Sequence, residues 1–195
     1  MNRILLISLL LSGPLLSQTD SARPTTFRLF AELSGGYFYT VSDPKMPMGE
    51  MTRDGFGMSA RVKWGSSNLL GVGIETGWMP ISSMNVRMLN TEFGGADIEA
   101  SRSAVPLLGL FSFQRAGVQV HVGAGYYRME SVVSMMGERM ISSEWDLGYV
   151  FAAGFARPVS DAVRIGAEVK VNGIVEQQLT LVSFQLRTMV RLYGE

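Results

Sequence analysis

Ten charged side chains stand at alternate positions within otherwise apolar segments of the sequence, and their types could support ion pairing or ion passage. They are Arg28, Glu32, Arg61, Lys63, Glu75, Arg164, Glu168, Lys170, Arg187 and Arg191. Seven are basic and three are acidic. Unpaired ions in a narrow, water-poor space are costly. We therefore expect a network of paired charges that fills and rigidifies the space they share; the alternative is a narrow pore that prefers anions.

His121 is the single histidine of the sequence, which contains no cysteine. The lack of cysteine excludes disulfides, thiolate zinc sites, a cysteine nucleophile and the lipid-bearing cysteine of a lipoprotein. An esterase or acyltransferase would need a histidine with a serine and a carboxylate, and the sequence flags no nucleophile near His121. We expect no catalytic residues, no cofactor and no metal site, because one histidine without cysteine gives too few ligands for a transition metal.

Methionine is unusually common, with 13 residues in the chain. Three interpretations remain open. The first is compositional bias with apolar packing in the loops, the second is an adaptable binding surface, which flexible thioethers favour, and the third is capture of a soft ion such as Cu(I). Eight of the methionines fall in segments that we expect to be long loops: Met46, Met48, Met51, Met84, Met88, Met135, Met136 and Met140.

The N-terminus has the pattern of a secretory signal peptide. Arg3 supplies a positive charge, Ile4 to Leu11 form an apolar run, and Ser17 and Ser21 are candidate cleavage sites. The run is shorter than the about 20 apolar residues that a membrane-spanning helix requires. We predict a signal peptide over residues 1–22, with the cleavage site left open, and one barrel domain over residues 23–195.

After Pro24, eight segments alternate between apolar and polar residues with a period of two, which is typical of β-strands. One face of each is apolar and uncharged, whereas the ten ions, His121 and many glycines lie on the other face. The segments cover residues 27–39, 56–64, 70–78, 105–113, 118–126, 147–155, 163–171 and 182–192. The connections at 40–54, 80–103 and 127–145 are long, those at 65–69, 114–117 and 156–162 are short, and that at 172–181 is intermediate.

This pattern predicts an all-β fold, an eight-stranded antiparallel up-and-down transmembrane β-barrel with short periplasmic turns and long extracellular loops. A closed sheet satisfies its own backbone hydrogen bonds, which lipid cannot do. The ionic face would fill a lumen just wide enough for side chains. Within it we place Arg28, Arg61, Lys63, Arg164 and Arg191 towards the short turns, with the three glutamates deeper.

Bulky aromatic residues of the apolar face gather near the expected strand ends, as in the interfacial girdles of membrane barrels. They are Tyr37, Tyr39, Trp64, Trp78, Phe113 and Tyr126. The apolar face would overfill a narrow lumen, so we expect it to face lipid. The alternative is a soluble, secreted, lipocalin-like binding barrel with the apolar face inside and the charges in water.

A small-Pro-Leu-Leu strand, Ala104-Val105-Pro106-Leu107-Leu108-Gly109-Leu110, is followed by a short turn and the glycine-containing strand Val122-Gly123-Ala124-Gly125-Tyr126. In this hairpin the sequence resembles the bacterial outer-membrane β-barrel family, namely OmpA- and OmpX-type eight-stranded barrels and the PorT-like group. The resemblance covers nearly all of the chain after the signal peptide. It implies insertion by the outer-membrane assembly machinery, for which Tyr193 would supply the terminal aromatic residue. OmpA-type proteins also carry a peptidoglycan-binding domain after the barrel, and here we expect no cell-wall attachment.

A net charge of zero gives no electrostatic case for nucleic acid. We expect a non-enzymatic outer-membrane barrel with a polar, plugged lumen and a structural or interaction role, its specificity residing in the long loops. The expected partners are outer-membrane lipid, the assembly machinery and an extracellular partner bound by the loops. A small porin-like barrel that passes solutes is the alternative from the transport class.

Overall fold

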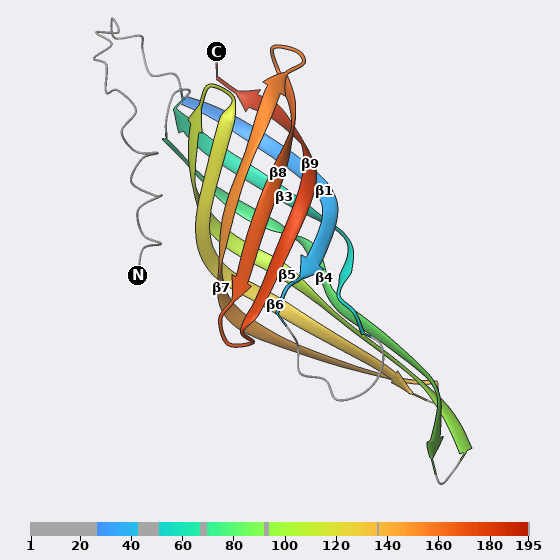
Figure 1. Cartoon of the computed structure of the whole chain (residues 1–195). Coiled ribbons are helices and arrows are strands. Elements are labelled where there is room, and N and C mark those ends of the chain that lie inside the picture. Colours follow the sequence, from blue (N-terminus) through green and yellow to red (C-terminus); the bar gives the residue numbers. More distant parts are fainter. Residues whose placement is uncertain (1–26, 43–50, 67–69, 92–93, 136, 195) are drawn as a thin grey trace, which may run out of the picture.

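The computed structural model describes residues 27–42, 51–66, 70–91, 94–135 and 137–194. Eight of the strands in these ranges form a closed antiparallel ring, because β4 pairs with β5 as well as with β3 (Figure 1). The predicted fold class, an eight-stranded antiparallel up-and-down transmembrane barrel, is confirmed. The strands are β1 (Phe27–Thr40), β2 (Met51–Thr52), β3 (Asp54–Ser66), β4 (Leu70–Thr91), β5 (Gly94–Arg115), β6 (Val118–Met135), β7 (Glu138–Pro158), β8 (Val163–Ile174) and β9 (Leu179–Tyr193), of which the short β2 stands outside the ring. In these same ranges, no helix is long and apolar enough to cross a membrane.

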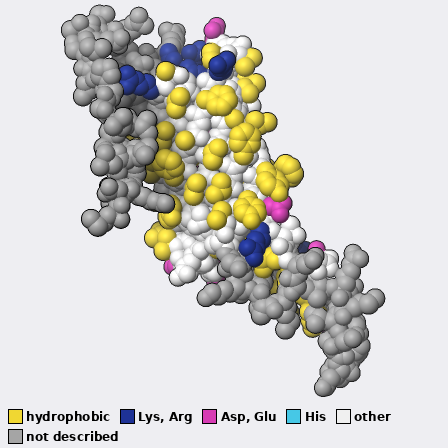
Figure 2. Space-filling view, in the orientation of Figure 1, with side chains coloured by type: hydrophobic (Ala, Val, Ile, Leu, Met, Phe, Trp, Pro, Cys, Tyr) yellow, Lys and Arg dark blue, Asp and Glu magenta, His cyan; other side chains and the backbone are white. Residues whose placement is uncertain are grey.

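Side chains of the barrel wall alternate between the outer surface and the lumen, as the pleat of a β-strand requires. On the outer face Phe111 is 58% exposed and Ile165 is 50% exposed, whereas Glu32 and Arg187 on the inner face are 2% and 1% exposed. Figure 2 shows hydrophobic side chains spread over the visible wall of the barrel. A soluble, lipocalin-like barrel needs the reverse arrangement, so the structure argues against that alternative.

The short turns gather at one end of the barrel, the upper end in Figure 1, where β9 also ends. The turn between β5 and β6 has Ala116 (φ 49°) and Gly117 (φ 86°) at its centre, both in the left-handed region that tight hairpin turns require. The Gly117 carbonyl accepts a hydrogen bond from the Ala156 amide at 2.9 Å. This bond ties the β5–β6 turn to β7.

Two connections that the sequence suggested as long loops, residues 80–103 and 127–145, are extensions of strands instead. β4 runs to Thr91, β5 begins at Gly94, β6 runs to Met135 and β7 begins at Glu138. We call these two extended hairpins, which project beyond the barrel in Figure 1, the hairpin arm. Over residues 138–145 of β7 the period-two signal is absent because both faces of the strand are exposed.

The remaining long and intermediate connections also differ from the prediction. β8 continues to Ile174 and β9 begins at Leu179, so the connection expected at 172–181 is a turn over residues 175–178. In the first long connection, residues 43–50 lie outside the described residues, and β2 pairs with β4. Where the structure describes them, the two predicted long loops at 80–103 and 127–145 are therefore almost entirely strand, built on the same sheet as the barrel.

Candidate functional site: the filled lumen

A cluster of ions fills the middle of the lumen, and Arg61 lies at its centre. The strand register sets Arg61 directly beside Glu32 on β1 and Glu75 on β4. Its guanidinium lies 2.9 Å from a Glu32 oxygen and 2.5 Å from a Glu75 oxygen. It also reaches across the lumen to Glu168 on β8, at 3.1 Å. Charge-assisted bonds from one planar group are strong and directional, so Arg61 joins four strands through a single side chain.

Three further basic side chains complete this cluster, and each has a carboxylate partner. Among the described residues the cluster therefore contains four basic and three acidic side chains, all of them buried. Burial of so many ions is tolerable only because they are paired. We call the cluster the ionic layer; besides the contacts of Arg61, its nitrogen–oxygen distances include Lys63–Glu32 at 2.8 Å, Lys170–Glu75 at 2.6 Å and Arg187–Glu168 at 3.1 Å.

The other three residues of the expected network, Arg28, Arg164 and Arg191, lie at the short-turn mouth and are only partly buried. The guanidinium of Arg164 stands over the Phe30 ring, 5.6 Å from its centroid. The placement of Arg61 nearer the short turns than the glutamates is wrong, because the register puts Arg61 level with two of them. Position along a strand does not reveal depth until the stagger between strands is known.

A layer of neutral polar side chains follows the ionic layer towards the hairpin arm. Ser34 Oγ lies 2.6 Å from Ser59 Oγ and donates a hydrogen bond to Gln185 Oε1 at 2.8 Å. Lys170 Nζ links the two layers by donating to Ser59 Oγ at 3.1 Å. We call Ser34, Ser59, Ser183 and Gln185 the polar layer; all four side chains are buried.

Apolar side chains fill the half of the lumen that is nearer the hairpin arm. The expectation of a polar lumen is wrong for this half. Leu107-Leu108 shows why the sequence pattern failed here. Leu108 points inward and Leu107 outward, and because both are apolar they form a continuous apolar run in which the two faces cannot be distinguished. We call this cluster the apolar plug: Phe38, Met79, Ile81, Ala104, Leu108, Leu110, Tyr127, Met129, Val150, Ile174, Leu179 and Leu181.

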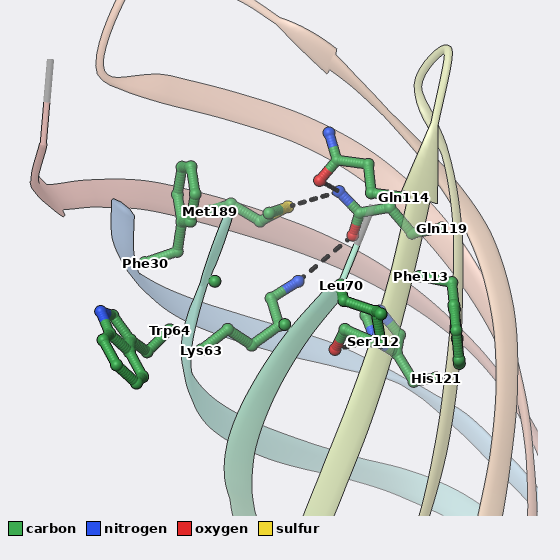
Figure 3. Close-up of a pocket in the computed structure, with 12 residues that line it drawn as sticks. Phe30, Lys63, Trp64, Leu70, Ser112, Phe113, Gln114, Gln119, His121 and Met189 are labelled. Carbon is green, nitrogen blue, oxygen red and sulfur yellow. Dashed lines mark hydrogen bonds between the residues drawn. The ribbon is translucent and has the colours of Figure 1, made fainter. Parts of the chain in front are cut away.

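A small cavity of about 40 Å³ lies at the short-turn mouth, beside the ionic layer (Figure 3). Lys63 Nζ donates to Gln119 Oε1 at 3.2 Å, and Gln119 Nε2 donates to Met189 Sδ at 3.7 Å. A space of this size holds a few water molecules. It has no room for an organic substrate.

His121 points into the lumen and is 1% exposed, and the register sets Ser112 beside it. Ser112 Oγ lies 2.7 Å from His121 Nδ1, and Glu168 Oε2 lies 3.5 Å from Nε2. These are the residue types of a hydrolase relay, which sequence reasoning missed because their proximity depends on strand register. Glu168 is already engaged by Arg61 and Arg187, and the adjoining cavity is too small for an acyl substrate. The arrangement is suited to filling the lumen with hydrogen-bonded groups.

The described ranges contain no group of three or more His, Cys, Asp or Glu residues arranged to hold a metal ion. The aromatic residues expected as girdles all lie on the outer face, between 43% and 55% exposed. Two outer-face aromatic residues stand beyond the expected girdle set: Phe27, which stacks on Trp64 with 5.2 Å between ring centroids, and Tyr149, which is 51% exposed. The six residues expected to form the girdles are Tyr37, Tyr39, Trp64, Trp78, Phe113 and Tyr126.

The methionines singled out above lie on strands wherever the structure describes them. The expectation that they lie in loops is therefore wrong for these residues. Met51 of β2 pairs with Met84 of β4, and Met135 and Met140 on the arm are 40% and 61% exposed. The backbone of Met88 belongs to β4, but its side chain lies outside the described part, as do Met46, Met48 and Met136.

No protein-family model matches the sequence, and no curated protein is significantly similar to it. Among solved structures, Ail, the attachment invasion locus protein of Yersinia pestis, determined in complex with the heparin analogue sucrose octasulfate, is 12% identical with a TM-score of 0.50. That alignment covers 85% of this chain and 99% of Ail. This chain has the fold of the outer-membrane β-barrels.

Two further solved structures align with the chain over most of their length. Neisserial surface protein A is 13% identical, with a TM-score of 0.43, and the alignment covers 85% of this chain and 97% of that one. The outer-membrane protease OmpT of Escherichia coli is 8% identical, with a TM-score of 0.38 and coverages of 90% and 99%. At such identities the likeness concerns the fold.

Proposed function

We propose that this chain is a non-enzymatic outer-membrane β-barrel whose side chains close the lumen and whose hairpin arm provides a structural or interaction surface. One observation carries the proposal. The ionic layer, the polar layer and the apolar plug succeed one another along the barrel, and their side chains are buried. A barrel of this size leaves an interior that side chains can fill completely.

Closure of the lumen follows from the energetics of these layers. A permeating ion would have to displace members of the ionic layer, and a buried charge that loses its partner costs several kcal/mol. It would then have to cross the apolar plug, where nothing replaces its hydration. Passage of solutes therefore requires both layers to rearrange.

The outer wall supports a membrane location. Large apolar side chains are exposed all round the ring, for example Phe56 at 76%, Leu186 at 65% and Phe151 at 50%. Soluble monomers rarely expose contiguous apolar patches of more than a few hundred Å². Exposed aromatic residues towards both ends suit the two lipid interfaces of an outer-membrane barrel.

Export would depend on residues 1–22 as a cleaved signal peptide, a segment that lies outside the described residues. Tyr193, 76% exposed at the end of β9, is placed where the assembly machinery could recognise it. The mass of the mature chain isolated from membranes tests the cleavage. A chain that retains its first 22 residues would contradict it.

The hairpin arm supports the interaction role. Met140, Ile141 and Trp145 on β7 are 61%, 58% and 58% exposed. Exposed apolar side chains on a projecting, strand-built element are typical of a surface that contacts another molecule. An extracellular partner held by this arm is therefore the expected ligand.

Membrane fractionation and planar-bilayer recording test the proposal together. We expect the protein in the membrane fraction, extractable only with detergent and with a heat-modifiable gel mobility, and we expect no steady single-channel steps. Steady steps would overturn the closed lumen in favour of the porin-like alternative. Release without detergent would overturn the membrane location.

A further inference from the structure

The short-turn end of the barrel carries an excess of positive charge. Its described residues include Arg28, Arg115, Arg157, Arg164 and Arg191, with Asp161 as the acidic residue. Figure 2 shows dark blue side chains gathered at this upper end. The opposite end has the reverse balance in the described ranges: Asp54, Glu99, Glu130, Glu138, Glu144, Asp146 and Glu176 against Arg53, Arg102, Arg128 and Arg139.

Two of these arginines continue rows of lipid-facing side chains. Arg115 follows Phe113 on β5, and Arg157 follows Phe155 on β7, each two residues further along the outer face. Phe113 and Phe155 are 46% and 54% exposed, and both arginines are exposed. In the described part of the chain, neither arginine side chain makes a hydrogen bond, ion pair or ring contact. They stand where the apolar wall ends, and none of the described residues pairs with either guanidinium group.

The two arginines are held in a defined relation to each other. The turn that follows Arg115 is fixed to β7 by the hydrogen bond from the Ala156 amide to the Gly117 carbonyl, at 2.9 Å. Arg157 is the next residue after Ala156. Strands β5 and β7 are separated by β6 alone, so the two arginine-bearing strands lie about 10 Å apart across the sheet.

Neighbouring groups mark this level of the barrel as a lipid interface. Phe27 and Trp64 stack on each other at the same end, and Tyr193 is exposed there. Aromatic residues of this kind sit at headgroup level. Arg164 and Arg191 lie at the same end of the barrel and add to the positive potential at the mouth.

We propose that Arg115 and Arg157 bind the phosphate groups of anionic phospholipids in the leaflet at the short-turn end. The proposal rests on the proposed membrane location. Long arginine side chains at the end of an apolar row reach the headgroups while their stems stay in lipid. The guanidinium fork pairs with phosphate oxygens in two parallel hydrogen bonds. Each basic residue at an anionic surface favours the anionic lipid by about fivefold.

Lipid competition on the full-length mature protein tests this inference. The protein is refolded into vesicles with equal amounts of phosphatidylcholine and phosphatidylglycerol, extracted in mild detergent, and its retained lipids are counted by native mass spectrometry. The native chain should favour phosphatidylglycerol, and the R115Q/R157Q variant should lose about 25-fold of that preference. The matched variant R128Q/R139Q, which removes two arginines from the opposite end, should keep it. R115K/R157K, which retains both charges but lacks the guanidinium fork, should keep most of it.

The outcomes separate this inference from the proposed function. Failure of the native chain to insert into these mixed vesicles would refute the membrane location itself. Insertion without preference for phosphatidylglycerol, or a preference that survives in R115Q/R157Q, would overturn the lipid site alone. If that variant does not fold, the native chain decides: its preference must fall at high salt, which screens exposed charges, and a salt-independent preference would overturn the proposal.

Discussion

The ionic layer and the apolar plug fill the same lumen by different forces. In the ionic layer, Arg61 alone holds carboxylates from three other strands at 2.5–3.1 Å. In the apolar plug, side chains such as Ile81 and Leu181 are fully buried without polar partners. Paired buried ions contribute little net stability but strongly penalise any arrangement that separates them. Burial of apolar surface stabilises in proportion to its area and is tolerant of small shifts.

The ionic layer and the apolar plug therefore make different contributions to the fold. Glu32, Arg61 and Glu75 stand in one row of the register. A slip of one residue in any of these strands would move its charged side chain from the lumen to the lipid-facing side. The ionic layer therefore selects one strand register. The apolar plug would tolerate several packings, and its contribution is stability.

Of the substitutions that test this difference, replacement of Arg61 should have the largest effect on the free energy of unfolding. Arg61→Met leaves three buried carboxylates without their shared partner, and we expect a loss of about 3–5 kcal/mol in the free energy of unfolding. Urea titration in vesicles, followed by the heat-modifiable gel mobility, measures it. Arg139→Met on the hairpin arm, the matched control, should change the value by less than about 0.5 kcal/mol. Equal effects of the two substitutions would contradict the role of the ionic layer.

Truncating a side chain of the apolar plug should lower the free energy of unfolding by somewhat less. Leu181→Ala removes a fully buried side chain, and such substitutions cost about 2–5 kcal/mol. This loss should not depend on salt. The same titration at low and high salt measures it, with Ile141→Ala on the arm as the control. A loss within about 0.5 kcal/mol would show that the plug is not packed.

The sequence predicted the ionic half of the lumen because its charges alternate with apolar residues. It could not predict the apolar half. There the inward residues Leu108 and Leu110 are apolar like their outward neighbours, so no alternation of polarity separates the two faces. The strands of the hairpin arm were not predicted for the opposite reason. Around Met140 and Ile141 both faces of the strand are exposed, so the sequence there has no period-two alternation of apolar and polar residues. Strand register, which brings Ser112 to His121 and Arg61 to Glu75, is a tertiary property that a single strand does not encode.

Gly36 and Gly35 offer a matched test of close packing between the two halves of the lumen. A Cβ at Gly36 would press against the backbone of Phe184 and Gln185, whereas one at Gly35 would meet Gly57 O at 3.7 Å, an ordinary contact. Gly36→Ala should therefore destabilise by about 1–3 kcal/mol. Gly35→Ala should be neutral or slightly stabilising in the same titration. Equal effects would contradict the tight approach of β1 and β9.

The smallest effect is expected in a turn that belongs to neither the ionic layer nor the apolar plug. In the turn between β8 and β9, a hydrogen bond to Asp146 raises the pKa of Glu176 above its ordinary value of 4.5. The raised pKa means that this bond supports the folded turn at pH values below 4.5 and is lost as the pH rises through the pKa of the folded protein. Carboxyl NMR titration should detect the raised pKa, and Asp146→Asn should lower it. An unchanged pKa in that variant would contradict the contact.

The lipid-facing wall and the filled lumen both depend on which way the side chains of the barrel strands point. Accessibility of single cysteines measures this orientation most directly, because the chain has no cysteine of its own. Fluorescent labels at Phe111→Cys, Val122→Cys and Ile165→Cys should be quenched by lipid-borne quenchers in vesicles, whereas Ser34→Cys and Ser183→Cys should resist a water-soluble thiol reagent. Outer labels that lipid does not quench, together with inner cysteines that react readily from water, would contradict a lipid-facing apolar wall around a filled lumen.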